Sequence, residues 1–133
     1  DTSPVRSRDK VLQSLYEMEL SGSSAEEILK DLSLQSRYPH YKDLLIGVVD
    51  SQEDIDKTLS EFMERDMPSL DPIERNTLRL AAYEMLFTDT DVPIIINESI
   101  RLSKKYGAAD GHKYVNAILD KMFKSNFQRI EQK

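Results

Sequence analysis

The sequence has 133 residues, no cysteine and a net charge of -6, and 32% of its residues are charged. This length suits one compact domain spanning 1–133, and the lack of cysteine excludes disulfides, thiolate metal ligands and cysteine nucleophiles. No apolar stretch approaches the roughly 20 residues that a membrane-spanning helix requires, and the first residues lack the apolar core of a secretion signal. We therefore expect a cytoplasmic protein with no membrane partner.

Charge is unevenly distributed along the chain. Residues 14–100 carry seven Lys and Arg against nineteen Asp and Glu, whereas residues 101–133 carry eight against three. A local basic surface can attract a polyanion even on an acidic protein, because fields in salt solution are screened within about 8–10 Å. The alternative is a C-terminal helix that is simply rich in lysine, and charge alone does not decide between the two.

The first part of the chain predicts two helices. Ser3 is a good N-cap and Pro4 suits the first helical position, and the helix that follows ends at the run 21-SGSS-24. In that run a serine followed three residues later by glutamate is a capping box, which predicts a new helix start. The box is Ser23 with Glu26 or Ser24 with Glu27, and the short helix after it carries Ile28, Leu29, Leu32 and Leu34.

The central part predicts one long helix and then a clear restart. Apolar and aromatic residues recur from 41 to 62 at near-heptad spacing, which is typical of a single helix packed along others. Asp71, Pro72 and Glu74 then have the residue types of an N-cap, a first helical position and a capping-box partner. The helix that they start runs to residue 87 and is apolar over a broad arc, so we expect it at the centre of the fold.

The last part predicts two further helices, over 94–106 and 110–123. Gly107 is expected to end the first of them in a left-handed conformation. Asp110 is expected to cap the second by accepting hydrogen bonds from its first-turn N–H groups.

The pattern as a whole predicts an all-α bundle of about six to seven helices. The only strand-like run is 92-VPIII-96, which leads directly into a helical pattern. Both ends of the chain, residues 1–3 and 125–133, are expected to fray.

No group of residues has the arrangement that catalysis or metal binding needs. His40 and His112 lie far apart in the sequence, and neither has a His or Glu neighbour at metal-ligand spacing. The glycines form no phosphate-binding loop, and no serine lies in a nucleophile elbow. We therefore expect a binding protein rather than an enzyme, with no cofactor and no metal.

The segment 110-DGHKY-114 supports two interpretations. Asp110 can accept hydrogen bonds from the free N–H groups of the helix start, which would make the segment a plain cap. Alternatively, the helix N-terminus with His112, Lys113 and Tyr114 can bind an anion or a stacked base. Tyr114 also lies close to the apolar stripe of the helix and is a candidate core residue.

Several segments resemble the NusB family of transcription antitermination factors. They are 75-RNTLRLAAYEM-85, 91-DVPIIINESIRLSKKYG-107 and 108-AADGHKYVNAILDK-121. The first helix, 6-RSRDKVLQSLYEMEL-20, is similar to the arginine-rich opening helix of that family. The resemblance covers most of residues 4–124 and implies an all-α fold of two packed three-helix groups.

The resemblance implies a non-enzymatic RNA-binding protein. Such proteins bind the boxA element of ribosomal RNA leader transcripts together with the ribosomal protein NusE, and join the RNA polymerase elongation complex with other Nus factors. Three alternatives stay open. The chain could be a similar domain detached from an RNA cytosine methyltransferase, a homodimer that covers its own RNA surface, or a helical protein-interaction scaffold unrelated to RNA.

The resemblance also implies which residues act. RNA contacts are expected from the first helix, from the region near residue 62 and from the start of the last helix, at Arg6, Arg8, Lys10, Tyr16, Phe62, Asp110, Lys113 and Tyr114. Contacts with the protein partner are expected from Glu74, Arg75, Tyr83 and Glu84. The acidic middle of the chain would attract a basic ribosomal protein.

At the start of the last helix the expected roles differ. The charge of Asp110 repels a phosphate placed on the same N–H groups. Lys113 is therefore expected to attract phosphate and Tyr114 to stack on a base, with Gly111 allowing close approach. In the first helix, Asp9 interrupts the arginine-rich segment and reduces its positive charge.

Overall fold

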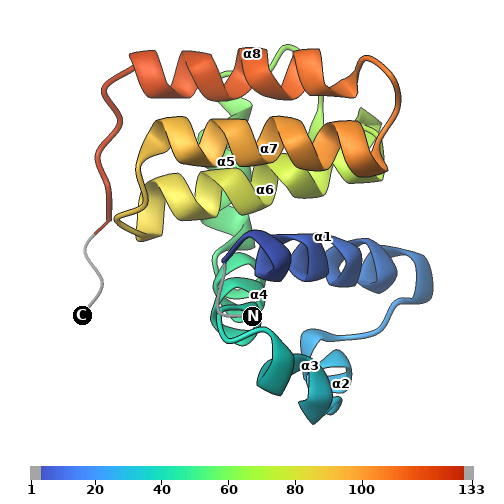
Figure 1. Ribbon diagram of the computed structural model, residues 1–133. Helices are drawn as coiled ribbons and strands as arrows, with labels where there is room; N and C mark the ends of the chain where they lie inside the picture. Colours follow the sequence, from blue (N-terminus) through green and yellow to red (C-terminus); the bar gives the residue numbers. More distant parts are fainter. Residues whose placement is uncertain (1–3, 131–133) are drawn as a thin grey trace.

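The computed structural model of the chain describes residues 4–130, and this part is built of helices and connecting turns (Figure 1). The helices are α1 Pro4–Ser21, α2 Ala25–Ile28, α3 Leu32–Arg37, α4 Tyr41–Asp50, α5 Gln52–Ser60, the 3-10 helix η1 Met67–Ser69, α6 Pro72–Phe87, α7 Val92–Tyr106 and α8 Gly111–Lys124. The described residues contain no strand, which confirms the predicted all-α fold. The predicted cap at Ser3 lies outside the described residues.

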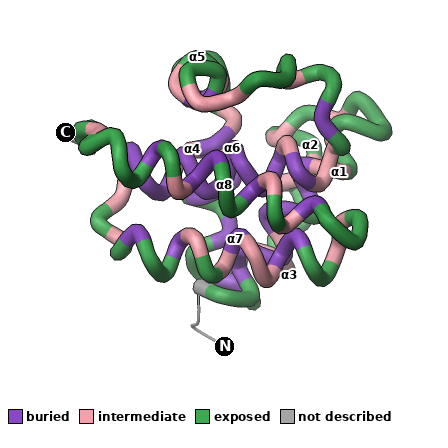
Figure 2. Tube along the Cα trace, turned by 90° about the horizontal axis from the view of Figure 1, so that it is seen from above, coloured by how far each residue is buried: buried purple, intermediate pink, exposed green. Residues whose placement is uncertain are grey.

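The helices form two packed groups that meet at α6. In one group α6, α7 and α8 lie side by side, stacked one above another in Figure 1. In the other, α1 packs on α4, and the short α2 and α3 also pack on α4. Helix α6 contacts α1, α4, α5, α7 and α8, and most of its residues are buried, so its predicted central position is confirmed (Figure 2).

Each group has its own apolar core. One core lies among α5, α6, α7 and α8, and the other lies between α1 and α4 and includes Leu80 of α6 and Leu102 of α7. Tyr83 packs against both cores, and its ring lies where a Cβ on Gly47 would be. Burying one leucine side chain contributes roughly 1.5–3 kcal/mol, so Leu80 and Leu102 help to fix the C-terminal group against α1.

The long helix predicted over 41–62 is instead two helices, because the chain bends at Ser51 (φ -103°, ψ 9°). Backbone hydrogen bonds continue through the bend, from Ser51 N–H to Gly47 O at 3.1 Å and from Ile55 N–H to Ser51 O at 2.9 Å. The bend directs α4 and α5 into different cores: Tyr41 joins the core beside α1, and Ile55 joins the core beside α6. The even heptad spacing gave no sign of this change of core.

Two predicted helix starts have the expected caps. Asp71 accepts a hydrogen bond from Ile73 N–H at 2.8 Å at the start of α6. Of the two possible capping boxes, the structure has that of Ser24, which accepts from Glu27 N–H at 3.1 Å. The short helix predicted after it is interrupted at residues 29–31 and forms α2 and α3 separately.

Two other predicted helix ends are corrected. Asp110 precedes α8 with φ -107° and ψ 2°, outside the extended range typical of an N-cap; its side chain makes no cap hydrogen bond and pairs with Lys113. Gly107 is extended (φ -104°, ψ -173°) rather than left-handed. It is needed for space, since a Cβ there would lie 2.8 Å from Ser103 O and 3.2 Å from Ile73 Cγ2.

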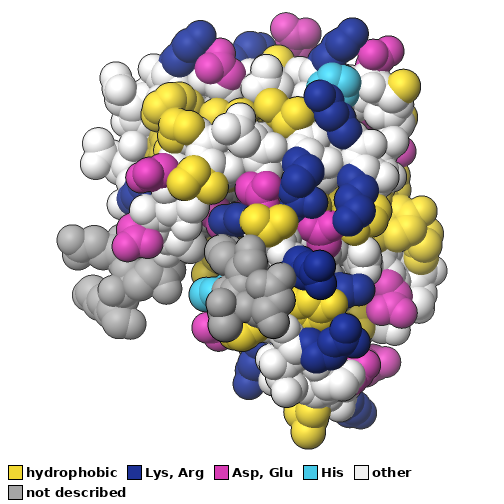
Figure 3. All heavy atoms as spheres, in the orientation of Figure 1, with side chains coloured by type: hydrophobic (Ala, Val, Ile, Leu, Met, Phe, Trp, Pro, Cys, Tyr) yellow, Lys and Arg dark blue, Asp and Glu magenta, His cyan; other side chains and the backbone are white. Residues whose placement is uncertain are grey.

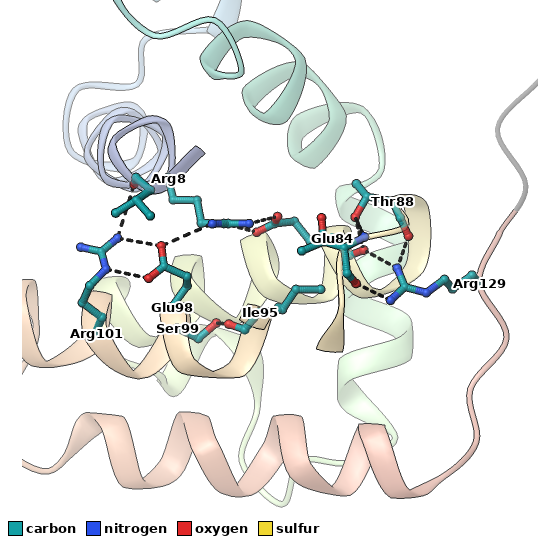
Figure 4. A network of polar contacts seen from close by, with 10 residues as sticks. Arg8, Glu84, Thr88, Ile95, Glu98, Ser99, Arg101 and Arg129 are labelled. Carbon is teal, nitrogen blue, oxygen red and sulfur yellow. Dashed lines mark hydrogen bonds and ion pairs between the residues drawn. The ribbon is translucent and has the colours of Figure 1, made fainter. Parts of the chain in front are cut away.

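Residues 125–130 were expected to fray but return to the end of α6. Ile130 N–H donates to Leu86 O at 2.6 Å. The guanidinium of Arg129 donates to the carbonyl oxygens of Thr88 and Thr90, which lie just beyond the last turn of α6 (Figure 4). The tail therefore satisfies backbone carbonyls that a helix C-terminus leaves without partners.

Candidate functional site

Asp9 joins α1 to the end of α7. Its carboxylate accepts hydrogen bonds from Arg101 Nη2 at 2.6 Å, Lys105 Nζ at 2.8 Å and the Tyr106 hydroxyl at 2.9 Å, and the residue is 7% exposed. Burial by itself would raise the pKa of Asp9, but the three hydrogen bonds outweigh it and lower the pKa to about 2. Asp9 is therefore charged at neutral pH and holds two cations of α7 beside α1.

These contacts bring the cations of both chain ends onto one surface, which we name the basic face. Lys and Arg side chains gather over α1 and the neighbouring ends of α7 and α8 (Figure 3). From helical spacing and the contacts of Asp9, we assign six residues to the basic face: Arg6 and Lys10 of α1, Arg101, Lys104 and Lys105 of α7, and Lys113 of α8. Lys10 and Arg101 are half-buried and the other four are exposed. Asp9, expected to reduce the positive charge of the arginine-rich segment, binds two further cations, Arg101 and Lys105.

Arg8 lies away from the basic face and is 3% exposed. Its Nε and Nη2 donate to the two carboxylate oxygens of Glu84 at 2.8 and 2.7 Å, and its Nη1 donates to Glu98 at 3.3 Å (Figure 4). Arg6 and Lys10 are four residues apart and share one side of the helix, whereas Arg8 is about 200° around the axis from Arg6. The expected phosphate contact by Arg8 is therefore corrected, since its guanidinium is enclosed within the fold.

Tyr16 lies farther along α1, beside the basic face. It is half-buried and lines a hollow of about 480 Å³ together with Lys10 and Leu34. Its lining contains one cation, Lys10, one carboxylate, Glu17, and the aromatic ring of Tyr16, on which a base could stack.

The start of α8 directs Lys113 outward and Tyr114 inward. The Lys113 side chain is 72% exposed and pairs with Asp110 at 3.2 Å, an exposed pair that water weakens. Tyr114 and Phe62 are both half-buried against the core beside α6. The Tyr114 hydroxyl is buried and has no hydrogen-bond partner within the described chain. Tyr114 is thus largely the core residue that its position near the apolar stripe suggested.

The space beside Gly111 is filled by the side chain of Glu74 and is not open to a base. A Cβ on Gly111 would lie 2.7 Å from Oε1 of Glu74, which is 8% exposed. The glycine therefore makes room for a buried carboxylate. Two expectations are corrected by this contact: Gly111 does not offer space for a base, and Glu74 does not lie on an open protein-binding surface.

The four residues expected to contact a protein partner do not form one surface. Arg75, at the start of α6, donates from Nε and Nη2 to Glu19 of α1 at 3.0 and 2.6 Å. Tyr83, near the other end of α6, stacks on Phe87 with ring centroids 5.3 Å apart. Glu84 is 3% exposed and lines, with Tyr83, a cavity of about 640 Å³ beside the start of α7. Glu84 was expected to contact a protein partner, but it is buried and does not lie on an open surface.

Sequence reasoning missed four cations that the structure places beside the expected ones. Arg101, Lys104 and Lys105 have the i, i+3, i+4 spacing that puts side chains on one side of a helix, so that spacing could have identified them. Arg65 gave no such signal, because it is a single arginine in the acidic segment 61-EFMERD-66. It lies over Tyr114, with Cζ 5.6 Å from the ring centroid.

Two kinds of site have no counterpart among residues 4–130. No helix there is both long and apolar enough to cross a membrane. No group of three or more His, Asp or Glu side chains in that range is placed to hold a metal ion.

Sequence comparison finds one family. The NusB family model matches residues 5–124. The transcription antitermination protein NusB of Nitrosomonas eutropha is 38% identical over an alignment of 125 residues, and the match covers 87% of this chain and 73% of that protein. The protein of the same name from Shewanella piezotolerans is 36% identical over an alignment of 124 residues, and the match covers 88% of this chain and 91% of that protein.

Solved structures have the same arrangement of helices. T. maritima NusB superposes with a TM-score of 0.84 at 31% identity, covering 93% of this chain and 92% of that one. A structure of antitermination factors NusB and NusE in complex with double-stranded RNA superposes with a TM-score of 0.77, covering 90% and 94%. Its sequence identity is 24%, so this second similarity shows the shared fold.

Proposed function

The chain belongs to the NusB family, and we propose from this that it is a transcription antitermination factor that binds boxA RNA of ribosomal RNA leader transcripts together with NusE. In this role it catalyses no reaction. It joins RNA to the RNA polymerase elongation complex with other Nus factors, in the cytoplasm.

The observation that carries the RNA-binding proposal is the basic face. The protein is acidic as a whole, at -6, yet Lys and Arg side chains gather over α1 and the neighbouring ends of α7 and α8 (Figure 3). Phosphate contacts fix the position of a bound nucleic acid, and distant acids are screened beyond about 8–10 Å. Tyr16, beside Lys10, then supplies an aromatic surface for a base.

For NusE we propose the surface of α5 and the start of α6. There Arg75 pairs with Glu19, and α5 exposes Glu53 and Asp54. A basic ribosomal protein would be attracted to these carboxylates and would associate faster. This surface is separate from the basic face, so RNA and protein can bind together.

The test is fluorescence anisotropy of labelled boxA RNA, with and without NusE, across a salt series. We expect NusE to tighten boxA binding and a scrambled RNA to bind more weakly. The logarithm of the affinity should fall with the logarithm of the salt concentration, with a slope of about 0.7 per phosphate contact. Equal binding of boxA and scrambled RNA, with NusE making no difference, would contradict the proposal.

A matched pair of variants locates the RNA surface. Lys104→Ala with Lys113→Ala removes two charges from the basic face, and Lys121→Ala with Lys124→Ala removes two from the rest of α8. All four lysines are exposed, and each pair contains one lysine in an exposed salt bridge. We expect the first double variant to lower the slope by about 1.4 and the affinity by roughly tenfold, and the second to leave both unchanged. Equal losses would mean that RNA follows net charge, not the basic face.

A further inference from the structure

The segment between α5 and α6 places an arginine on the outside of the Tyr114 ring. Arg65 Cζ lies 5.6 Å from the ring centroid, and its Nη2 donates to Ser69 O at 2.7 Å. The hydrogen bond to the backbone restrains the guanidinium, and Arg65 itself is exposed. Arg65 thus presents to solvent a planar cation whose position is restrained.

This arrangement changes which group can stack on a base. One side of Tyr114 packs against the core beside α6, and the guanidinium of Arg65 lies over the ring. A base stacking on this side of the ring would have to displace Arg65, whereas Arg65 itself is exposed to solvent. Guanidinium planes stack on unpaired bases in protein–RNA complexes much as aromatic rings do.

The charged residues near Arg65 favour a base over a phosphate as the group that binds there. Glu61, Glu64 and Asp66 surround Arg65 in sequence, and all three are exposed. The segment therefore carries a net negative charge that repels a phosphate but leaves an uncharged base unaffected. Arg65, Met63 and Met67 also line a hollow of about 710 Å³, which supplies apolar surface beside the guanidinium.

We infer that Arg65, supported by Tyr114, forms a subsite for one unpaired RNA base, which stacks on the outer guanidinium face. This inference rests on the proposed RNA-binding function. Lys113, next to Tyr114 in α8 and 72% exposed, attracts the phosphate of the same strand. The bound strand runs from the basic face past Lys113 to Arg65.

Two substitutions separate stacking from charge. Arg65→Ala removes the plane and the charge, and Arg65→Lys keeps the charge but removes the plane. We expect both variants to weaken single-stranded boxA binding by about 5- to 15-fold, with the salt slope changed by less than that of Lys113→Ala. Binding to a fully paired duplex of the same sequence should be unchanged, since its bases are not available. Lys42→Ala, an exposed lysine on α4, serves as the control for a lost charge.

A base analogue reports the contact directly. With 2-aminopurine placed at single positions along the RNA, wild-type protein should change the fluorescence at one position, and both Arg65 variants should remove that change. If Arg65→Lys binds RNA like the wild type and Arg65→Ala lowers the salt slope, Arg65 is a phosphate contact. That outcome would overturn the inference. If the wild type binds RNA and neither variant changes that binding, the subsite is overturned but the proposed function is not. No RNA binding by the wild type would overturn the proposed function as well.

Discussion

Two ionic clusters join α1 to the C-terminal helices, and they differ in how far they exclude water. The side chains of Arg8 and Glu84 are each 4% exposed. The cations that bind Asp9 are far more open, with Arg101 at 32% and Lys105 at 56%. Glu98 links the two clusters, because it accepts from Arg8 at 3.3 Å and from Arg101 at 2.9 Å (Figure 4).

This difference separates a structural role from a binding role within one helical turn. All three guanidinium nitrogens of Arg8 donate to carboxylates, which fixes α1 against α6 and α7. The cations around Asp9 keep much of their surface in water, so they can exchange that water for a phosphate at little desolvation cost. The five residues 6-RSRDK-10 therefore supply both the internal anchor and part of the basic face.

The strongest test of this contrast is Arg8→Ala. We expect it to lower the free energy of unfolding by about 3–5 kcal/mol, because it leaves Glu84 buried and charged without its partner. Urea denaturation followed by circular dichroism measures the loss. Arg8→Met combined with Glu84→Gln removes both charges and should recover most of the stability.

The RNA affinity of the Arg8→Ala protein that remains folded completes the test. Its salt slope should equal that of the wild type, because Arg8 does not lie on the basic face. A stability loss below about 1 kcal/mol together with a smaller slope would make Arg8 a phosphate contact and remove the contrast between the clusters.

Asp9 gives a smaller effect that depends on pH. Its pKa in the folded protein is about 2, below the ordinary value of 3.8, so folding favours the charged carboxylate. The resulting stabilisation is complete above the ordinary pKa and is lost as the pH falls through about 2. Because water screens the exposed partners, we expect a contribution of about 1–2 kcal/mol.

Comparison of wild type with Asp9→Asn at several pH values measures this contribution. The difference in unfolding free energy should be constant from pH 7 to about 5 and should shrink between about pH 4 and 2. A difference that stays the same at every pH would show that Asp9 acts through hydrogen bonding and packing, without its charge.

The fold could be predicted where the signal is local. Asp71 and Ser24 cap helices because their side chains reach N–H groups two or three residues away, and α1 ends within the run 21-SGSS-24 as expected, where Gly22 has φ 75°. The bend at Ser51 could not be predicted in this way. Its cause is the division of α4 and α5 between two cores, which depends on helices distant in sequence.

The residues of the candidate site also differ in whether the sequence could predict their positions. The separation of Arg6 and Lys10 from Arg8 follows from helical periodicity and could have been predicted. The partners of Asp9 lie 92 and 96 residues away, at Arg101 and Lys105, and only the packing of α7 beside α1 brings them together. A sequence shows the charge of Asp9 but not the cations that surround it.

The smallest expected effect belongs to Lys124 and Asp120, an exposed i, i+4 pair on α8. Their charged atoms lie 2.8 Å apart, nearly the 2.7 Å of Arg8 and Glu84, but the side chains are 74% and 44% exposed. A double-mutant cycle should give a coupling energy of about 0.3–0.5 kcal/mol, which about 1 M salt should largely remove. If it instead matched the coupling of Arg8 with Glu84, distance rather than burial would set the strength of both pairs. Because the two distances are nearly equal, a large ratio between the couplings would show that burial and the second hydrogen bond from Arg8 to Glu84, and not distance, strengthen the buried pair.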